Sequence, residues 1–190
     1  EFRRVLFRSG QQKLVSELAK TGKPVIALVM CGRPVIFNEI REHADAVLCT
    51  WWLGSEAGNA ICNVLWGEYN PSAKLPMTFP AHVGQIPIYY QNKSTGRPTA
   101  LKQTYKASYI DASTEPAYPF GYGLSYTDFG YSDLKLLPGK AAGVHTEVSV
   151  KVTNTGKCAG EEVVQLYVQD KVASVTRPIK ELKEIGRAHV

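Results

Sequence analysis

The alternation of helical and strand-like patterns in the first third of the chain constrains the fold most strongly. Apolar residues recur with helical spacing in 11–21, 35–44 and 56–66, whereas 24–30 (PVIALVM) and 44–51 (ADAVLCTW) are nearly continuous apolar runs. A short apolar run rich in β-branched residues is typical of a strand that is buried on both faces. Helix, strand, helix, strand and helix with short connections predict a mostly parallel sheet covered by helices. The sequence therefore predicts a partial α/β fold here.

Turn and capping residues set the expected limits of these helices. Gly22 is expected to end the first helix, Pro34 to begin the second, and Ser55 to cap the third. We expect the first helix to bury Leu14 and Leu18 on one face.

The pattern changes after Asn70. The stretch 81–130 is dense in proline, glycine and tyrosine and shows little periodicity. Fifty residues without clear elements are long for a loop in a compact domain. We therefore interpret 11–80 as the C-terminal part of an α/β sandwich domain, and 81–130 as a structured interdomain segment that packs on it.

The last third of the chain switches to a period of two. Apolar and polar residues alternate in 145–153 and again in 162–170, which predicts antiparallel strands. A sandwich of fibronectin type has about seven strands, whereas 131–184 supplies three or four. We therefore predict an incomplete antiparallel β-sandwich with an open edge over 131–184.

Both ends of the chain differ from their surroundings. Residues 1–10 begin with EFRRVLFRS and residues 185–190 read IGRAHV, and both resemble the ends of a sequencing adapter translated in frame. We interpret them as artefacts and expect the natural protein to extend further on both sides.

The charge and hydropathy of the chain exclude two classes of partner. Without the two ends the net charge falls from +5 by three, to +2, and a charge this small predicts no nucleic-acid partner. No apolar run approaches the roughly 18 residues that span a bilayer, so no membrane partner is predicted.

Four cysteines are present, and their spacing does not suggest a metal site. Cys31, Cys49, Cys62 and Cys158 form no CxxC pair, and no histidine cluster accompanies them. Cys31 and Cys49 are expected at neighbouring strand ends, where buried thiols are favoured over a disulfide. We predict no metal ion and no cofactor.

Five stretches together resemble family 3 glycoside hydrolases of the bacterial β-glucosidase type. They are TGKPVIALVMCGRP (21–34), ADAVLCTWWLGSEAGNAICNVLWGEYNPSAKLPMTFP (44–80), VGQIPIYYQNKSTGRP (83–98), YPFGYGLSYTDFGYSDL (118–134) and GEEVVQLYVQDKVASVTRPIKELK (160–183). In such enzymes a (β/α)₈ barrel precedes an α/β sandwich domain and, in many members, a fibronectin type III-like domain. The resemblance implies that this chain is a C-terminal fragment, with 131–184 as the partial fibronectin-like domain.

The family's chemistry is retaining hydrolysis of β-linked sugars by two carboxylates. The resemblance implies an aspartate nucleophile in a Ser-Asp-Trp type motif and an acid/base glutamate in a Gly-Glu-Gly type stretch. Neither motif occurs in this sequence. We therefore assign no catalytic residue here and expect the fragment itself to be inactive. The resemblance also implies an exported enzyme, periplasmic or extracellular.

Four residues are candidates for contact with the sugar. Trp51 and Glu56 follow the second apolar strand, and ligands of open α/β sheets bind at the carboxyl ends of strands. An indole face suits the C–H face of a sugar, while a carboxylate accepts hydrogen bonds from hydroxyls. The alternatives are that Trp51 belongs to the core and that Glu56 favours the helix N-terminus. Lys93 and Arg97, with Thr95 between them, lie on a polar loop that either reaches the sugar or is simply solvated.

The sequence thus predicts part of an exo-acting β-glucosidase whose substrate is a β-linked oligosaccharide or glucoside. A related β-xylosidase is one alternative. A non-catalytic carbohydrate-binding or interaction module is another, but the sandwich portion has only Tyr131 and Tyr167 as aromatic residues suited to a binding row.

Overall fold

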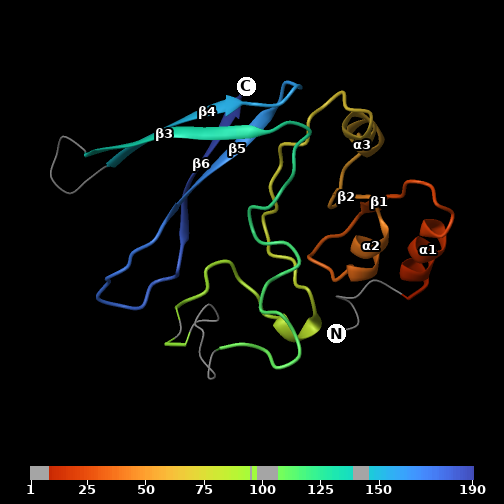
Figure 1. Ribbon diagram of the computed structural model, residues 1–190, viewed down its shortest axis with the longest axis horizontal. Coiled ribbons are helices and arrows are strands. Elements are labelled where there is room, and N and C mark those ends of the chain that lie inside the picture. Colours follow the sequence, from red (N-terminus) through yellow and green to blue (C-terminus); the bar gives the residue numbers. More distant parts are fainter. Residues whose placement is uncertain (1–8, 95, 98–106, 139–145) are drawn as a thin grey trace.

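The computed structural model describes residues 9–94, 96–97, 107–138 and 146–190 (Figure 1). The helices are α1 (Ser9–Ala19), α2 (Asn38–His43), α3 (Ala57–Leu65) and a short 3₁₀ turn η2 (Val83–Gln85). The strands are β1 (Ile26–Val29), β2 (Ala46–Cys49), β3 (Phe129–Pro138), β4 (Thr146–Asn154), β5 (Glu161–Val168) and β6 (Glu181–His189).

The first part of the chain folds as the predicted α/β unit. Strands β1 and β2 pair in parallel, in a register that runs from Ile26 opposite Ala46 to Val29 opposite Cys49. The core beside this pair consists of buried apolar side chains from β1, the β1–α2 connection, α2 and a distant extended segment. They are Val29, Cys31, Val35, Phe37, Ile40 and Phe79. A parallel sheet with helices therefore confirms the predicted fold class of this part.

One expectation about this sheet is wrong. Strand β1 is buried on one face only: Val29 is 1% exposed, whereas Ile26 is 53%, Leu28 is 42% and Met30 is 55% exposed. Leu14 of α1 is also exposed. The reason is that no element within the described residues covers the outer face of β1, so alternate apolar side chains stay in contact with solvent.

The helix limits also differ from the prediction. Helix α2 begins at Asn38, because the buried residues of 35–37 enter the core from an extended backbone before the helix starts. Pro34 therefore lies outside its first turn. Helix α3 has Glu56 rather than Ser55 at its N-cap position, without a side-chain capping bond. Leu18 of α1 is exposed as well, whereas Val15 on the same helix is half-buried and packs against the core, so the predicted apolar face is only partly buried.

Two extended segments connect the α/β unit to the strand-rich part. Residues 70–80 and 118–128, the ochre and green traces between the two parts in Figure 1, run side by side. Phe79 and Tyr118 form an antiparallel bridge, and the Leu75 amide donates to the Tyr122 carbonyl at 2.8 Å. These backbone bonds make a continuous support out of segments about 45 residues apart in the sequence.

The last part contains two antiparallel strand pairs, β3–β4 and β5–β6. In β4, Val148, Val150 and Val152 are half-buried and alternate with exposed residues, which confirms the predicted period. Four strands are described, the upper end of the predicted number. Strand β6 runs to His189, so residues 185–189, which we interpret from the sequence as an artefact, pair with β5 in the structure. Among the described helices, none is long and apolar enough to cross a membrane.

Candidate functional site

The loops that follow β1 and β2 leave the sheet at the same edge, because the two strands are parallel. Residues 30–33 form one loop and 50–56 form the other. This edge carries two of the four predicted contact residues.

Trp51 lies against the core of the α/β unit. Its ring centroid is 5.7 Å from that of Phe79, and the two rings are tilted by 59°. Its backbone has a φ of 54°, which is uncommon for a large side chain and costs on the order of 1–3 kcal/mol. Half-burial and ring packing agree with the core alternative, and the left-handed backbone turns the chain sharply after Thr50.

The neighbouring Trp52 is the more accessible indole, with 80% of its surface exposed. Its ring lies over the first loop: a Cβ placed on Gly32 would be 3.2 Å from Trp52 Cε2 and Cζ2. Gly32 thus leaves room for a flat aromatic surface at this edge. The sequence selected Trp51 as a candidate and did not single out Trp52, because the doublet itself does not say which ring turns inward.

Glu56 is exposed and occupies the N-cap position of α3. Its carboxylate accepts a hydrogen bond from Asn59 Nδ2 at 2.6 Å, one turn along the helix. A negative charge at this helix end is favourable because the helix dipole is positive there. The contact agrees with the alternative that Glu56 favours the helix N-terminus. The carboxylate is nevertheless exposed to solvent.

Cys31 and Cys49 lie together beneath this edge, as the strand ends predicted. Both are free thiols. Burial raises the pKa of Cys31 to about 11, with the neighbouring Cys49 contributing in the same direction. Burial also raises the pKa of Cys49. Both groups therefore remain neutral thiols, which suits a core position better than nucleophilic chemistry.

Lys93 belongs to a different region. It forms an antiparallel bridge with Pro178, and it lines a cavity of about 710 Å³ together with Tyr90 and Phe120. The Tyr90 and Phe120 rings stack with centroids 4.2 Å apart. Arg97 is exposed and its carbonyl accepts from the Ala107 amide at 2.8 Å.

The structure places Trp51 and Glu56 in one region and Lys93 in another. Trp51 and Glu56 lie at the sheet edge, while Lys93 lies in the cavity wall near Arg97 in sequence. Thr95 lies outside the described residues.

Among the described residues, Glu39, Glu42 and His43 are the side chains close enough to share a cation. All three are exposed on one side of α2, and the Glu39 carboxylate is 3.7 Å from His43 Nε2. An exposed pair of this kind at helical spacing is ordinary surface chemistry, so it does not define a metal centre.

Comparison with protein-family models gives two matches. Residues 4–126 match the glycosyl hydrolase family 3 C-terminal domain, and residues 162–190 match a fibronectin type III-like domain. The first match alone covers well over half of the chain.

Curated relatives agree with these matches. The chain is 49% identical over 176 residues to a periplasmic beta-glucosidase of Salmonella typhimurium, covering 91% of this chain and 23% of the relative. It is 47% identical over 178 residues to a beta-xylosidase of Formosa agariphila, covering 93% and 24%. The chain therefore spans about a quarter of the length of the curated relatives it matches.

Solved structures show the same relation. The beta-glucosidase from Listeria innocua in complex with glucose superposes with a TM-score of 0.92 at 39% identity, covering 98% of this chain and 26% of that one. A complex of a mutant of that enzyme with laminaribiose superposes with a TM-score of 0.90.

Proposed function

Because the chain belongs to glycoside hydrolase family 3, we propose that it is the C-terminal part of a retaining, exo-acting β-glycosidase that hydrolyses terminal β-linked glucosyl residues. The observation that carries this proposal is the agreement of sequence and fold, over more than nine tenths of the chain, with proteins named as β-glucosidases. A β-linked oligosaccharide or glucoside is the proposed substrate of the whole enzyme.

The two reacting carboxylates belong to polypeptide outside this sequence. Retaining hydrolysis needs an attacking carboxylate and an acid/base carboxyl about 5 Å apart across the scissile bond. The family motifs that supply them are absent here. We therefore assign this chain a supporting role, with the barrel of the whole enzyme expected to provide the nucleophile.

The sheet edge is the part of the α/β unit best suited to face the sugar. It presents the exposed Trp52 indole and the solvent-facing carboxylate of Glu56. Stacking on an indole buries apolar sugar C–H groups, and a carboxylate orients hydroxyls. Trp51, packed on Phe79, acts in this proposal by holding the loop rather than by touching the sugar. Lys93 and Arg97 remain predicted contacts on the polar loop.

The alternative substrate is a β-xyloside, which the Formosa agariphila relative supports by its name. The sugar is selected by contacts of the whole enzyme, so assays of the extended protein decide between the two. The name of the Salmonella typhimurium relative supports export to the periplasm as the proposed location.

The test compares two proteins. The 190-residue chain is expected to release no nitrophenol from p-nitrophenyl β-glucoside or β-xyloside above an empty-vector preparation. The protein encoded with its upstream sequence is expected to hydrolyse the β-glucoside with retention of the anomeric configuration, followed by NMR. Turnover by the short chain alone, or an inverted product from the long one, would refute the proposal.

Within the extended protein, Trp52→Ala and Glu56→Gln test the sheet edge. Each is expected to lower kcat/KM at least about tenfold, because a stacking or hydroxyl contact at the reacting sugar is lost. Glu17→Gln on the exposed face of α1 is the matched control and is expected to have no effect. Unchanged kcat/KM in both edge variants would remove this edge from the site without touching the family assignment.

A further inference from the structure

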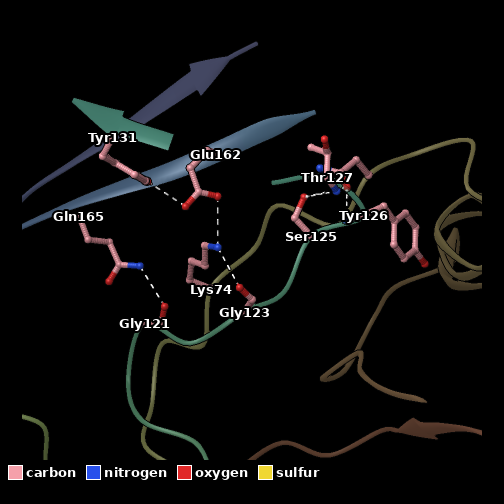
Figure 2. Close-up of polar contacts among 10 residues, drawn as sticks. Lys74, Gly121, Gly123, Ser125, Tyr126, Thr127, Tyr131, Glu162 and Gln165 are labelled. Carbon is pink, nitrogen blue, oxygen red and sulfur yellow. Dashed lines mark hydrogen bonds and ion pairs between the residues drawn. The ribbon is translucent and has the colours of Figure 1, made fainter. Parts of the chain in front are cut away.

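A buried polar junction connects the strand pairs to the extended segments. Three stretches meet there: 70–80, 118–127 and β5 (Figure 2). The first two are already joined by backbone bonds, since the Gly121 amide donates to the Leu75 carbonyl at 2.8 Å. They form a platform on which β5 lies.

An ion pair holds β5 on this platform. Lys74 Nζ lies 3.2 Å from Glu162 Oε2, and the two side chains are only 14% and 12% exposed. The same ammonium donates to the Gly123 carbonyl at 2.9 Å. A charge pair this far from solvent has restricted geometry, and removing one partner leaves an uncompensated buried charge.

The other carboxylate oxygen of Glu162 reaches the second strand pair. Tyr131 on β3 donates its hydroxyl proton to Glu162 Oε1 at 2.9 Å. Glu162 belongs to β5, and therefore to the β5–β6 pair. Its carboxylate contacts the platform through Lys74 and the β3–β4 pair through Tyr131, as Figure 2 shows. Gln165 Nε2 adds a parallel contact by donating to the Gly121 carbonyl at 3.1 Å.

The far end of the β5–β6 hairpin returns to the cavity. The Ile179 amide donates to the Asn92 carbonyl at 3.0 Å, and Pro178 bridges Lys93. Ile179 and Lys180 line the same cavity as Tyr90. The position of this wall therefore depends on how the hairpin is oriented on the platform.

We propose that Glu162 is the positioning residue that fixes both strand pairs on the α/β unit and thereby holds the hairpin tip in the cavity wall. Apolar packing is non-directional, and many apolar side chains of these strands are exposed, among them Leu134, Leu136 and Ile185. Packing alone therefore does not specify the angle at which the hairpin sits. A buried carboxylate whose two oxygens have different partners does specify it.

The test is amide hydrogen exchange of the 190-residue chain and its variants, read at two amides. Exchange at the Ile179 amide reports local opening of the hairpin tip. Exchange at the Thr50 amide, which donates to the Val29 carbonyl at 3.1 Å, reports opening of the α/β unit. Lys74→Met and Glu162→Gln are each expected to accelerate exchange at Ile179 at least about tenfold, with little change at Thr50. The double variant is expected to exchange no faster than the faster single variant, because neither charge is left unpaired.

Lys183→Met is the matched control, since Lys183 pairs with Glu181 on the same hairpin but is half exposed. It is expected to leave both amides unchanged. Should the single variants fail to fold, Tyr131→Phe decides the question, because it removes one hydrogen bond and no charge. It is expected to accelerate Ile179 at least about threefold. Unchanged exchange at Ile179, or equal acceleration at Ile179 and Thr50, would overturn the positioning role.

Discussion

Replacing Gly121 by alanine tests the close packing of the platform against β5. Gly121 has a φ of +79°, and a Cβ at this position would collide with Gln165 Oε1 and lie 2.8 Å from the Tyr167 hydroxyl. The Gly121 carbonyl also accepts a hydrogen bond from the side-chain amide of Gln165. The substitution therefore combines backbone strain, a clash with side chains of β5, and a threatened hydrogen bond.

The expected magnitude follows from these parts. Alanine in the left-handed region costs about 1–2 kcal/mol relative to glycine. Displacing Gln165 loses a hydrogen bond with a net value of about 1 kcal/mol. Because Gln165 also accepts from Tyr167 at 2.6 Å, its side chain has little freedom to move away. We expect Gly121→Ala to lower the free energy of unfolding by about 2–4 kcal/mol.

Gly67→Ala supplies the control that isolates the clash. Gly67 has nearly the same φ of +78°, but a Cβ there meets nothing within 4 Å. It is expected to cost only the backbone strain of about 1–2 kcal/mol. Urea unfolding of both variants, followed by tryptophan fluorescence and far-UV circular dichroism, measures the difference. Equal destabilisation by the two substitutions would refute the claim that β5 packs directly on Gly121.

Two further predictions concern titratable groups. In the native chain at pH 8, iodoacetamide is expected to modify the exposed Cys62 and Cys158 quickly, and Cys31 and Cys49 only after denaturation. Burial raises the pKa of both inner thiols, and the value of about 11 for Cys31 leaves roughly 100-fold less thiolate than in an ordinary cysteine. More than two rapidly modified thiols, counted by mass spectrometry, would contradict this. Partial burial and the Glu162 carboxylate, which accepts the Tyr131 hydroxyl hydrogen bond, raise the pKa of Tyr131 from 10.0 to about 12. Its neutral form is favoured in the folded state, so the associated stability is complete below about pH 10 and is lost as the pH rises towards 12. The urea midpoint should therefore fall more steeply above pH 10 in the wild type than in Tyr131→Phe, and identical slopes would argue against the shift.

The sequence predicted those parts of the fold that depend on local patterns. The apolar runs 24–30 and 44–51 became the parallel strands, and alternation in 145–153 became β4. The errors have a common cause. The exposure of Ile26 and Leu28 depends on which neighbours cover the sheet, and periodicity carries no information about neighbours.

The site was harder to predict for the same physical reason. Trp51 and Trp52 have identical side chains, but Trp51 has a left-handed backbone and packs its indole on Phe79, whereas Trp52 remains exposed. No local pattern signals that turn, because tryptophan has no preference for positive φ. The position of this loop at the carboxyl end of a predicted strand indicated that it could contact a ligand, but not which ring is available.

The junction at Glu162 shows most clearly what local reasoning omits. In sequence, Glu162 is one of two adjacent glutamates at the start of an alternating strand, where a charged residue is usually solvated. Its neighbour Glu161 is paired near the surface with Arg187 and His189, whereas Glu162 turns towards Lys74. Successive strand residues face opposite sides, so one of the two had to point inward. A carboxylate is stable on the inner side only where a cation and a hydrogen-bond donor lie beside it. Here these groups are Lys74 and Tyr131, which lie 88 and 31 residues away in the sequence. The buried position of Glu162 therefore depends on tertiary contacts, and the alternating strand pattern alone does not predict it.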